Sequence, residues 1–336
     1  MIINGFNTKK KVLIVAEIGN NHEGKFILAK KMIDLAHKAG ADAVKFQTFK
    51  VEKFISKKNE ERFQKLKKFQ LSFSEFNKLK SYTVKKKMIF ISTPLDLISS
   101  SFISRIAHAI KISSGDNNFY ELIKRSINKK KTLIISTGMT NKNDIDKILK
   151  YIKKKVGLNY LRKKVALLHC VTSYPVSDEC ANLRSISFLK DKFNLLTGYS
   201  DHTLGNEACL AAVALGARIV EKHFTFNKKY SNFRDHALSA DYKDLKNLVS
   251  SIRKIEKMLG SYKKDIQKIE VPFQKSTRRA IYAIKDIKKG SLLNRNNIDF
   301  LREGPSSIDL DFDKIIKKKT RKFLKKETLI NKRDLY

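Results

Sequence analysis

The stretch Val12-Leu-Ile-Val-Ala-Glu-Ile-Gly-Asn-Asn-His-Glu-Gly24 decides the fold of this 336-residue chain. Residues 12–18 are apolar except for Glu17, so they predict a buried strand that delivers a carboxylate and a polar loop at its C-terminal end. The arrangement recurs seven more times, and each later strand also ends in residues that can take part in chemistry. Polar residues at the same end of eight successive strands are typical of an active site at the mouth of a barrel.

Eight short apolar runs are predicted to be strands, and helical patterns alternate with them. The strands are 12–19, 42–47, 88–94, 109–114, 132–138, 165–171, 195–201 and 218–224, and the helices are 26–39, 74–86, 95–105, 119–128, 141–154, 183–192, 206–215 and 242–259. Eight strand–helix units predict an α/β fold, a (β/α)8 TIM barrel over residues 1–260. A doubly wound open sheet is the alternative, which is disfavoured because no GxGxxG follows the first strand.

The composition changes after about residue 262. Short β segments around turns then follow one another, and about sixty residues remain, which is near the minimum size of an independent domain. We therefore expect a linker at 261–276 and a small β-rich domain at 277–336.

The formal net charge of +38 suggests a nucleic-acid partner at first sight. Lys far outnumbers Arg, however, and the lysine runs fall near predicted helix ends without the interleaved aromatic residues of a base-stacking platform. We expect a solvated surface and no nucleic-acid partner. No apolar run reaches the roughly 20 residues of a membrane span, so we expect a soluble, cytoplasmic protein.

Motifs at the strand ends resemble one known family. They are Ala16-Glu-Ile-Gly-Asn-Asn-His-Glu-Gly24, Ala43-Val-Lys-Phe-Gln47, Ser92-Thr-Pro94, Lys111-Ile-Ser-Ser-Gly115, Ser136-Thr-Gly-Met139, Leu168-His-Cys170 with Tyr174-Pro175, Tyr199-Ser-Asp-His-Thr203 and Glu221-Lys-His-Phe-Thr225. The chain resembles the sialic acid synthase family, whose members condense phosphoenolpyruvate with an N-acetylhexosamine. Its tail, from residues 278–283 to 301–304, is similar to that family's antifreeze-like (SAF) domain.

Phosphoenolpyruvate carries a phosphate and a carboxylate, and two strands offer lysines to face them. Lys45 and Lys111 are point charges, and a lysine inside Val-Lys-Phe would be costly to bury without a partner. The resemblance implies that both lysines bind phosphoenolpyruvate. It implies the same for a set of hydroxyl-bearing residues, which are Thr93, Ser114, Ser136, Thr172 and Ser200.

His202 and His223 end the seventh and eighth predicted strands, where two imidazoles can hold a divalent metal. Hydrogen-bonded structural histidines are the alternative. The resemblance implies Mn²⁺ at this pair, with Mg²⁺ or Co²⁺ also possible, and a Lewis-acid role at the sugar aldehyde.

Two carboxylates complete the expected chemistry. Carbon 3 of the enol ether must attack the aldehyde, and the oxocarbenium at carbon 2 must be stabilised and take up water before phosphate leaves by C–O cleavage. Glu17 is the expected acid near the metal and the sugar. The family has a glutamate after its Ser-Gly, and this chain has Asp116, whose side chain is shorter by one methylene.

The resemblance implies sugar contacts from Glu17, Gln47, Tyr174 and Asp235. Two departures affect this pocket: Thr172 replaces the family's asparagine, and the loop 233–241 lacks the usual Pro-Gly-Pro-Asp. The sugar itself is therefore left open.

Arg302 matches an arginine that reaches the sugar's N-acetyl group, with an ordinary surface charge as the alternative. In the family the small domain covers the partner's barrel, so we expect a homodimer.

The leading expectation is a metal-dependent synthase that joins phosphoenolpyruvate to N-acetylmannosamine. A legionaminate or pseudaminate synthase, which uses a diacetamido-trideoxyhexose, is the first alternative. A non-catalytic binder of polyanions or nucleic acid is a remote one.

Overall fold

The computed structural model describes residues 1–302, 304, 307–308 and 310–336, and it divides into two compact units, Met1–Gly260 and Ser261–Tyr336. Each unit is described by itself. Glu303, which belongs to the quoted tail motif, lies outside the described residues.

The first unit, in which every residue is described, is a closed parallel barrel of eight strands. They are β3 (Leu13–Gly19), β4 (Ala43–Thr48), β5 (Ile89–Pro94), β6 (Ala109–Ile112), β7 (Thr132–Ser136), β8 (Val165–Cys170), β9 (Leu196–Asp201) and β10 (Ile219–His223). Neighbouring strands pair in chain order, and β10 closes the barrel on β3, with His223 opposite Glu17. All eight predicted strands are present, so the (β/α)8 barrel is confirmed.

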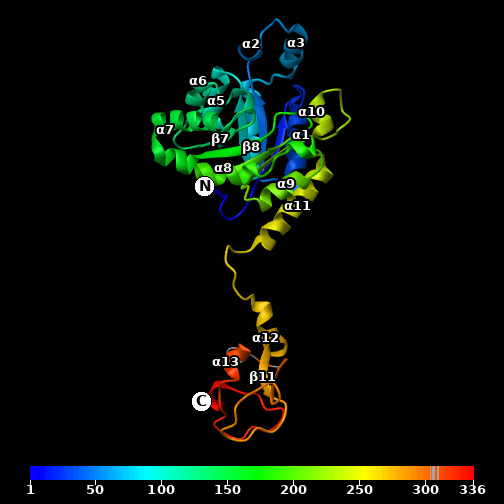
Figure 1. Ribbon diagram of the computed structural model, residues 1–336. Coiled ribbons are helices and arrows are strands. Elements are labelled where there is room, and N and C mark those ends of the chain that lie inside the picture. The colour runs from blue at the N-terminus through cyan, green and yellow to red at the C-terminus, as the bar shows by residue number, and fades with distance from the viewer. Residues whose placement is uncertain (303, 305–306, 309) are drawn as a thin grey trace. The chain divides into compact units, whose positions relative to one another are not determined.

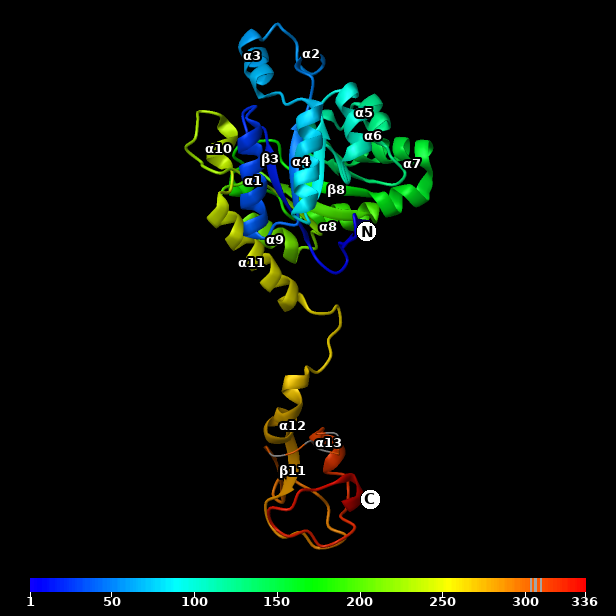
Figure 2. The same ribbon diagram turned by 180° about the vertical axis from the view of Figure 1, so that it is seen from behind.

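Helices surround the strands on the outside of the barrel (Figures 1 and 2). They are α1 (Phe26–Ala39), α4 (Phe73–Lys85), α5 (Leu97–Ile106), α6 (Tyr120–Ser126), α7 (Lys142–Lys164), α8 (Ser185–Phe193), α9 (Glu207–Ala214) and α11 (Tyr242–Leu259). Helix α7 runs beyond the end predicted for it at residue 154. It is broken at Gly157, whose φ of 83° is not helical. No helix in the described part of the chain is long and apolar enough to cross a membrane.

Three short helices that the sequence pattern does not predict lie in loops after strand ends. The loop after β4 contains α2 (Val51–Phe54) and α3 (Glu60–Phe69), and α10 (Arg234–Leu238) follows β10. Figures 1 and 2 show α2 and α3 projecting together from one end of the barrel. Phe63 and Phe69 of α3 are buried with Phe49 and Val51, so the segment that contains α2 and α3 has a small apolar core of its own.

Two apolar layers hold the barrel together. The larger lies between strands and helices, and the smaller fills the barrel interior with residues such as Leu13, Ile91 and Ile134. An N-terminal hairpin of β1 (Ile2–Ile3) and β2 (Phe6–Asn7) adds Ile3, which is 1% exposed, to the interior layer. Apolar side chains thus fill the barrel, and open space is left at the ends of its strands.

The second unit contains α12 (Val271–Thr277) and a two-stranded antiparallel sheet of β11 (Arg279–Ala283) and β12 (Ile298–Arg302). The short helix α13 (Phe312–Ile315) follows. The apolar core of this second unit includes Ile281, Leu293 and Leu324. Helix α12 and a 3-10 turn at Lys268–Glu270 occupy part of the expected linker.

Candidate active site

A cavity of about 350 Å³ lies at the ends of the barrel strands. Its lining includes thirteen of the residues that the sequence singles out. They are Glu17, Lys45, Gln47, Thr93, Lys111, Ser114, Asp116, Ser136, Thr172, Tyr174, Ser200, His202 and His223. We call this space the inner cavity. The structure therefore brings together the expected anion, acid and metal residues, which come from every strand end of the barrel. Asp235 lies outside this lining, and Arg302 is an exposed residue of the other unit.

Two lysines and two glutamates form a chain of ion pairs on the floor of the inner cavity. The Nζ atom of Lys45 lies 2.9 Å from Oε2 of Glu17 and 3.5 Å from Oε1 of Glu221. The same oxygen of Glu221 accepts a hydrogen bond from Lys111 Nζ at 3.1 Å and one from the Ser200 hydroxyl at 2.9 Å. All four charged side chains are at most 7% exposed, so the lysines are stabilised by pairing.

The two glutamates titrate in opposite directions. Burial raises the pKa of Glu17 to about 7; Lys45 opposes this rise and Glu221 adds to it. Burial alone would also raise the pKa of Glu221, but Lys111 and Lys45 outweigh burial and hold it at about 2. Near neutral pH, Glu221 is therefore an anion, whereas Glu17 is present in both protonation states.

Hydroxyl groups crowd one side of the inner cavity around Gly138. The Gly138 amide donates to Ser114 Oγ at 3.1 Å, and a Cβ at this glycine would lie 2.6 Å from that oxygen and 2.5 Å from Thr172 Oγ1. Only glycine fits there. The Ser136 hydroxyl is buried without a hydrogen-bond partner among the described residues. Such hydroxyl groups can donate to an anion held between the lysines.

His202 and His223 face one another across the cavity rim, with ring centroids 5.4 Å apart. Nδ1 of His202 lies 2.8 Å from the Val171 carbonyl and so carries the proton of the neutral ring, which leaves Nε2 with a lone pair. Burial holds the pKa of His223 well below its usual range, and its Nδ1 has no partner among the described residues. Burial would lower the pKa of His202, but the Cys170 thiol and the Val171 carbonyl outweigh burial and raise it. In its neutral form each ring has a free nitrogen that fits a divalent metal.

A metal at this place would be held by His202 and His223. The described part of the chain holds no cluster of three or more His, Cys, Asp or Glu side chains suited to a metal. Substrate or water oxygens would complete the coordination, as in catalytic sites that keep open positions.

A second ion pair lies beside these histidines in the sequence. Lys222 precedes His223 and Asp201 precedes His202, and their side chains meet at 2.5 Å with 3% and 0% exposure. Lys222 also donates to the Thr203 carbonyl at 2.6 Å. This Asp201–Lys222 pair joins the adjacent strands β9 and β10, where the two residues are opposite one another in register.

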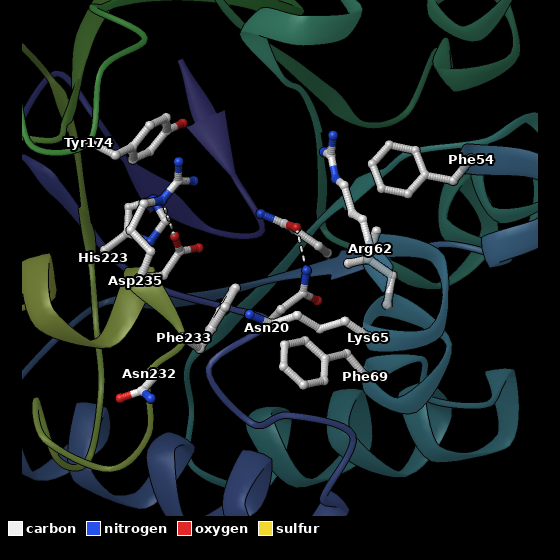
Figure 3. Close-up of a pocket in the computed structure, with 13 residues that line it drawn as sticks. Asn20, Phe54, Arg62, Lys65, Phe69, Tyr174, His223, Asn232, Phe233 and Asp235 are labelled. Atoms are coloured by element: carbon white, nitrogen blue, oxygen red, sulfur yellow. Dashed lines mark hydrogen bonds and ion pairs between the residues drawn. The ribbon is translucent and has the colours of Figure 1, made fainter. Parts of the chain in front are cut away.

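A second cavity of about 480 Å³ adjoins the first and is lined in part by the same residues. We call it the outer cavity. The shared residues are Gln47, Phe54, Arg62, Tyr174 and His223. Figure 3 shows Tyr174, His223 and Asp235 on one side and Phe54 and Arg62 on the other.

Polar contacts fix several side chains of the outer cavity. The Asn20 amide donates to Gln47 Oε1 at 2.7 Å, which turns the Gln47 amide group to face away from Asn20. Arg234 lies over the Tyr174 ring at 4.4 Å and pairs with Asp235 at 3.4 Å. Burial raises the pKa of Asp235, and the positive charge of Arg234 lowers it by a smaller amount.

Asp116 lines the inner cavity from a 3-10 turn, Ser114–Asp116, that follows β6. The Ser113 hydroxyl donates to its carboxylate, which fixes the side chain. Burial raises the pKa of Asp116, and Ser113 opposes the rise. The shorter side chain thus still reaches the cavity.

Sequence reasoning missed Glu221, Asn20 and Arg62 as members of the site. Glu221 and Asn20 stand in quoted motifs, and a buried glutamate within an apolar strand is a signal that could have identified Glu221. Arg62 stands in an exposed, charge-rich helix, where nothing in the sequence distinguishes it from its neighbours.

Both cavities lie at the carboxyl end of a (β/α)8 barrel, which is where enzymes of this fold carry their active sites. Residues 32–264 match the NeuB family. The chain is 37% identical to N,N'-diacetyllegionaminic acid synthase of Campylobacter jejuni over 96% of this chain and 99% of that protein. It is 32% identical to pseudaminic acid synthase of the same species, over 97% of each chain.

A solved structure adds the three-dimensional comparison. The crystal structure of N-acetylneuraminic acid (sialic acid) synthetase from Leptospira borgpetersenii, in complex with citrate, matches with a TM-score of 0.73 and 36% identity. The match covers 78% of this chain and 90% of that one. The chain therefore belongs to the NeuB family, and the resemblance seen in its motifs is confirmed.

Proposed function

We propose that the chain condenses phosphoenolpyruvate with an N-acetylated hexosamine, with N-acetylmannosamine as the first candidate, to give N-acetylneuraminate and phosphate. The observation that carries the proposal is the chain of ion pairs from Glu17 through Lys45 and Glu221 to Lys111, in one cavity with His202 and His223. Two buried lysines with hydroxyl donors around them suit a small molecule that carries two anionic groups.

The proposed reaction forms one carbon–carbon bond and breaks one carbon–oxygen bond. Carbon 3 of phosphoenolpyruvate attacks the sugar aldehyde, whose oxygen takes up a proton. Water adds to carbon 2 and gives up a proton, and phosphate leaves from carbon 2. A Glu17 carboxyl with a pKa of about 7 exists in both forms near neutral pH, so it suits both proton transfers. Asp116 suits stabilisation of the positive charge that develops at carbon 2.

A divalent metal held by His202 and His223 would polarise the aldehyde oxygen. Mn²⁺ is the first candidate, with Mg²⁺ and Co²⁺ as alternatives. The outer cavity is the proposed sugar site, because Gln47, Tyr174 and Asp235 offer it an amide, a phenol and a carboxylate.

A diacetamido-trideoxyhexose is the second candidate sugar, which would make the chain a legionaminate or pseudaminate synthase. One wall of the outer cavity favours it. Phe54, Leu66, Phe69 and Phe233 form an apolar lining there, and Phe69 packs edge-on against Phe233. Such a wall suits the methyl groups of acetamido and 6-deoxy substituents better than a hydroxymethyl group.

We also propose a homodimer in which the small unit of one subunit covers the barrel mouth of the other. Arg302, exposed at the end of β12, would then reach the sugar in the partner's site. The support is the family resemblance of the tail and the exposure of this arginine.

Phosphate release in the presence of Mn²⁺, measured across N-acetylmannosamine, N-acetylglucosamine and the diacetamido-trideoxyhexoses, tests the proposal. Release should require phosphoenolpyruvate, Mn²⁺ and one of these sugars. A Lys111→Ala variant that circular dichroism shows to be folded should release none. Failure of every sugar with folded, metal-loaded protein would contradict the proposed function.

A further inference from the structure

Arg62 occupies the junction of the inner and outer cavities and lines both. It stands in the first turn of α3, where its backbone amide donates to the Asn59 side chain at 3.1 Å. The buried Phe63 and Phe69 anchor this helix to the barrel mouth. Figure 3 shows Arg62 beside Phe54, across the cavity from Tyr174 and His223.

The other cations of the two cavities already have partners. Lys45 and Lys111 pair with Glu17 and Glu221, Arg234 pairs with Asp235, and Lys65 lies over the Phe233 ring at 5.1 Å. Among the described residues, no carboxylate pairs with Arg62 and no aromatic ring lies under its guanidinium. Arg62 is an exposed residue at the edge of both cavities, so its guanidinium is free to meet an anion that enters from solvent.

The charge of the inner cavity leads to the same conclusion. Its two lysines are each paired with a glutamate, so part of their positive charge is already offset when an anion enters. Phosphoenolpyruvate carries about three negative charges at neutral pH, because its phosphate is nearly fully ionised. A metal would offset two of them, and Arg62 supplies the next positive charge at the cavity mouth.

We propose that Arg62 binds a phosphate group at the junction of the two cavities. Its planar guanidinium can donate two parallel hydrogen bonds to phosphate oxygens, which a lysine cannot do. The inference rests on the proposed function for the identity of the substrates. The phosphate has two possible sources: phosphoenolpyruvate itself, or a phosphate ester on the hexosamine in the outer cavity.

Isothermal titration with phosphoenolpyruvate and with inorganic phosphate, each in the presence of Mn²⁺, tests the contact directly. The variants are Arg62→Ala and Arg62→Lys, and Lys67→Ala is the matched control. Lys67 is an exposed cation on the same helix that lines neither cavity. Arg62→Ala should weaken binding of inorganic phosphate by about tenfold, the scale of one charge-assisted hydrogen bond, and should weaken phosphoenolpyruvate equally if the phosphate is its own. Arg62→Lys should recover part of the loss, and Lys67→Ala should bind like the unaltered protein.

Steady-state kinetics with a hexosamine and its 6-phosphate distinguish the two sources. If Arg62→Ala raises the KM for phosphoenolpyruvate and leaves that for the sugar unchanged, the phosphate is that of phosphoenolpyruvate. If only the KM for the sugar 6-phosphate rises, the phosphate belongs to the sugar.

The proposal is overturned if no phosphate ligand responds to Arg62→Ala more than to Lys67→Ala. Failure of the proposed function looks different. The protein would then turn over no hexosamine, whereas titration with inorganic phosphate would still report on Arg62.

Discussion

Loss of Lys222 should destabilise the barrel far more than loss of a surface lysine. Lys222→Met removes the cation from a pair whose carboxylate, Asp201, is 0% exposed. Breaking a buried pair in this way costs about 3–5 kcal/mol. We expect the lower end, about 3 kcal/mol, because Asp201 keeps hydrogen bonds from Tyr199 and Thr203.

For a barrel of this size, about 3 kcal/mol corresponds to a fall of roughly 6–12 °C in melting temperature. Thermal unfolding followed by circular dichroism would measure it. Lys150→Met is the matched control, because Lys150 pairs with Asp146 at 3.2 Å but is 77% exposed. An exposed pair of this kind contributes under about 1 kcal/mol.

The double variant Asp201→Asn with Lys222→Met tests the reasoning further. It removes both charges, so it should be less destabilised than the sum of the two single variants. A Lys222→Met protein that melts within 2 °C, roughly the assay error, of Lys150→Met would show that the pair does not hold β9 and β10 together.

Three further outcomes follow from the site. His202→Ala and His223→Ala should each stay folded but lose Mn²⁺ binding by titration, and retention of full affinity in either would refute the metal pair. The pKa of Glu17 is raised from 4.5 to about 7 on folding, so the folded state holds an extra proton between these values and its stability falls as pH rises through that window. Urea unfolding at pH 5 and 8 should therefore show Glu17→Gln gaining stability relative to the unaltered protein at the higher pH, whereas an equal difference at both would contradict the raised pKa. Mixing Arg302→Ala with Lys111→Ala subunits should restore phosphate release, because roughly a quarter of all sites carry neither lesion after random exchange; no recovery after proven exchange would contradict a shared site.

The sequence predicted the barrel because its strands are buried on both faces and end in polar residues. Continuous apolar runs predicted the eight strands. Polar residues at the ends of these strands line one cavity. The N-terminal hairpin was not predictable in this way, since two strands of two residues each have no periodicity to detect.

The ion pairs inside the site could not be predicted from the sequence, because they form only when the barrel is closed. Lys45, Lys111 and Glu221 are each visible in the sequence, but Glu221 meets both lysines only across the barrel interior. The place of Arg62 in the site could not be predicted for a different reason. The direction in which α3 projects from the barrel end depends on the packing of Phe63 and Phe69, which no local pattern reveals.

The crowding around Gly138 has a consequence for how such an enzyme diversifies. The hydroxyl groups of Ser114 and Thr172 leave no room there for even one methyl group, so Gly138 itself cannot be replaced unless its neighbours move. The outer half is built largely from α3 and from residues 232–235, whose side chains can be exchanged without moving a strand. Evolution, or a mutant library confined to these two segments, can therefore explore new sugars while the bond-forming chemistry is inherited intact.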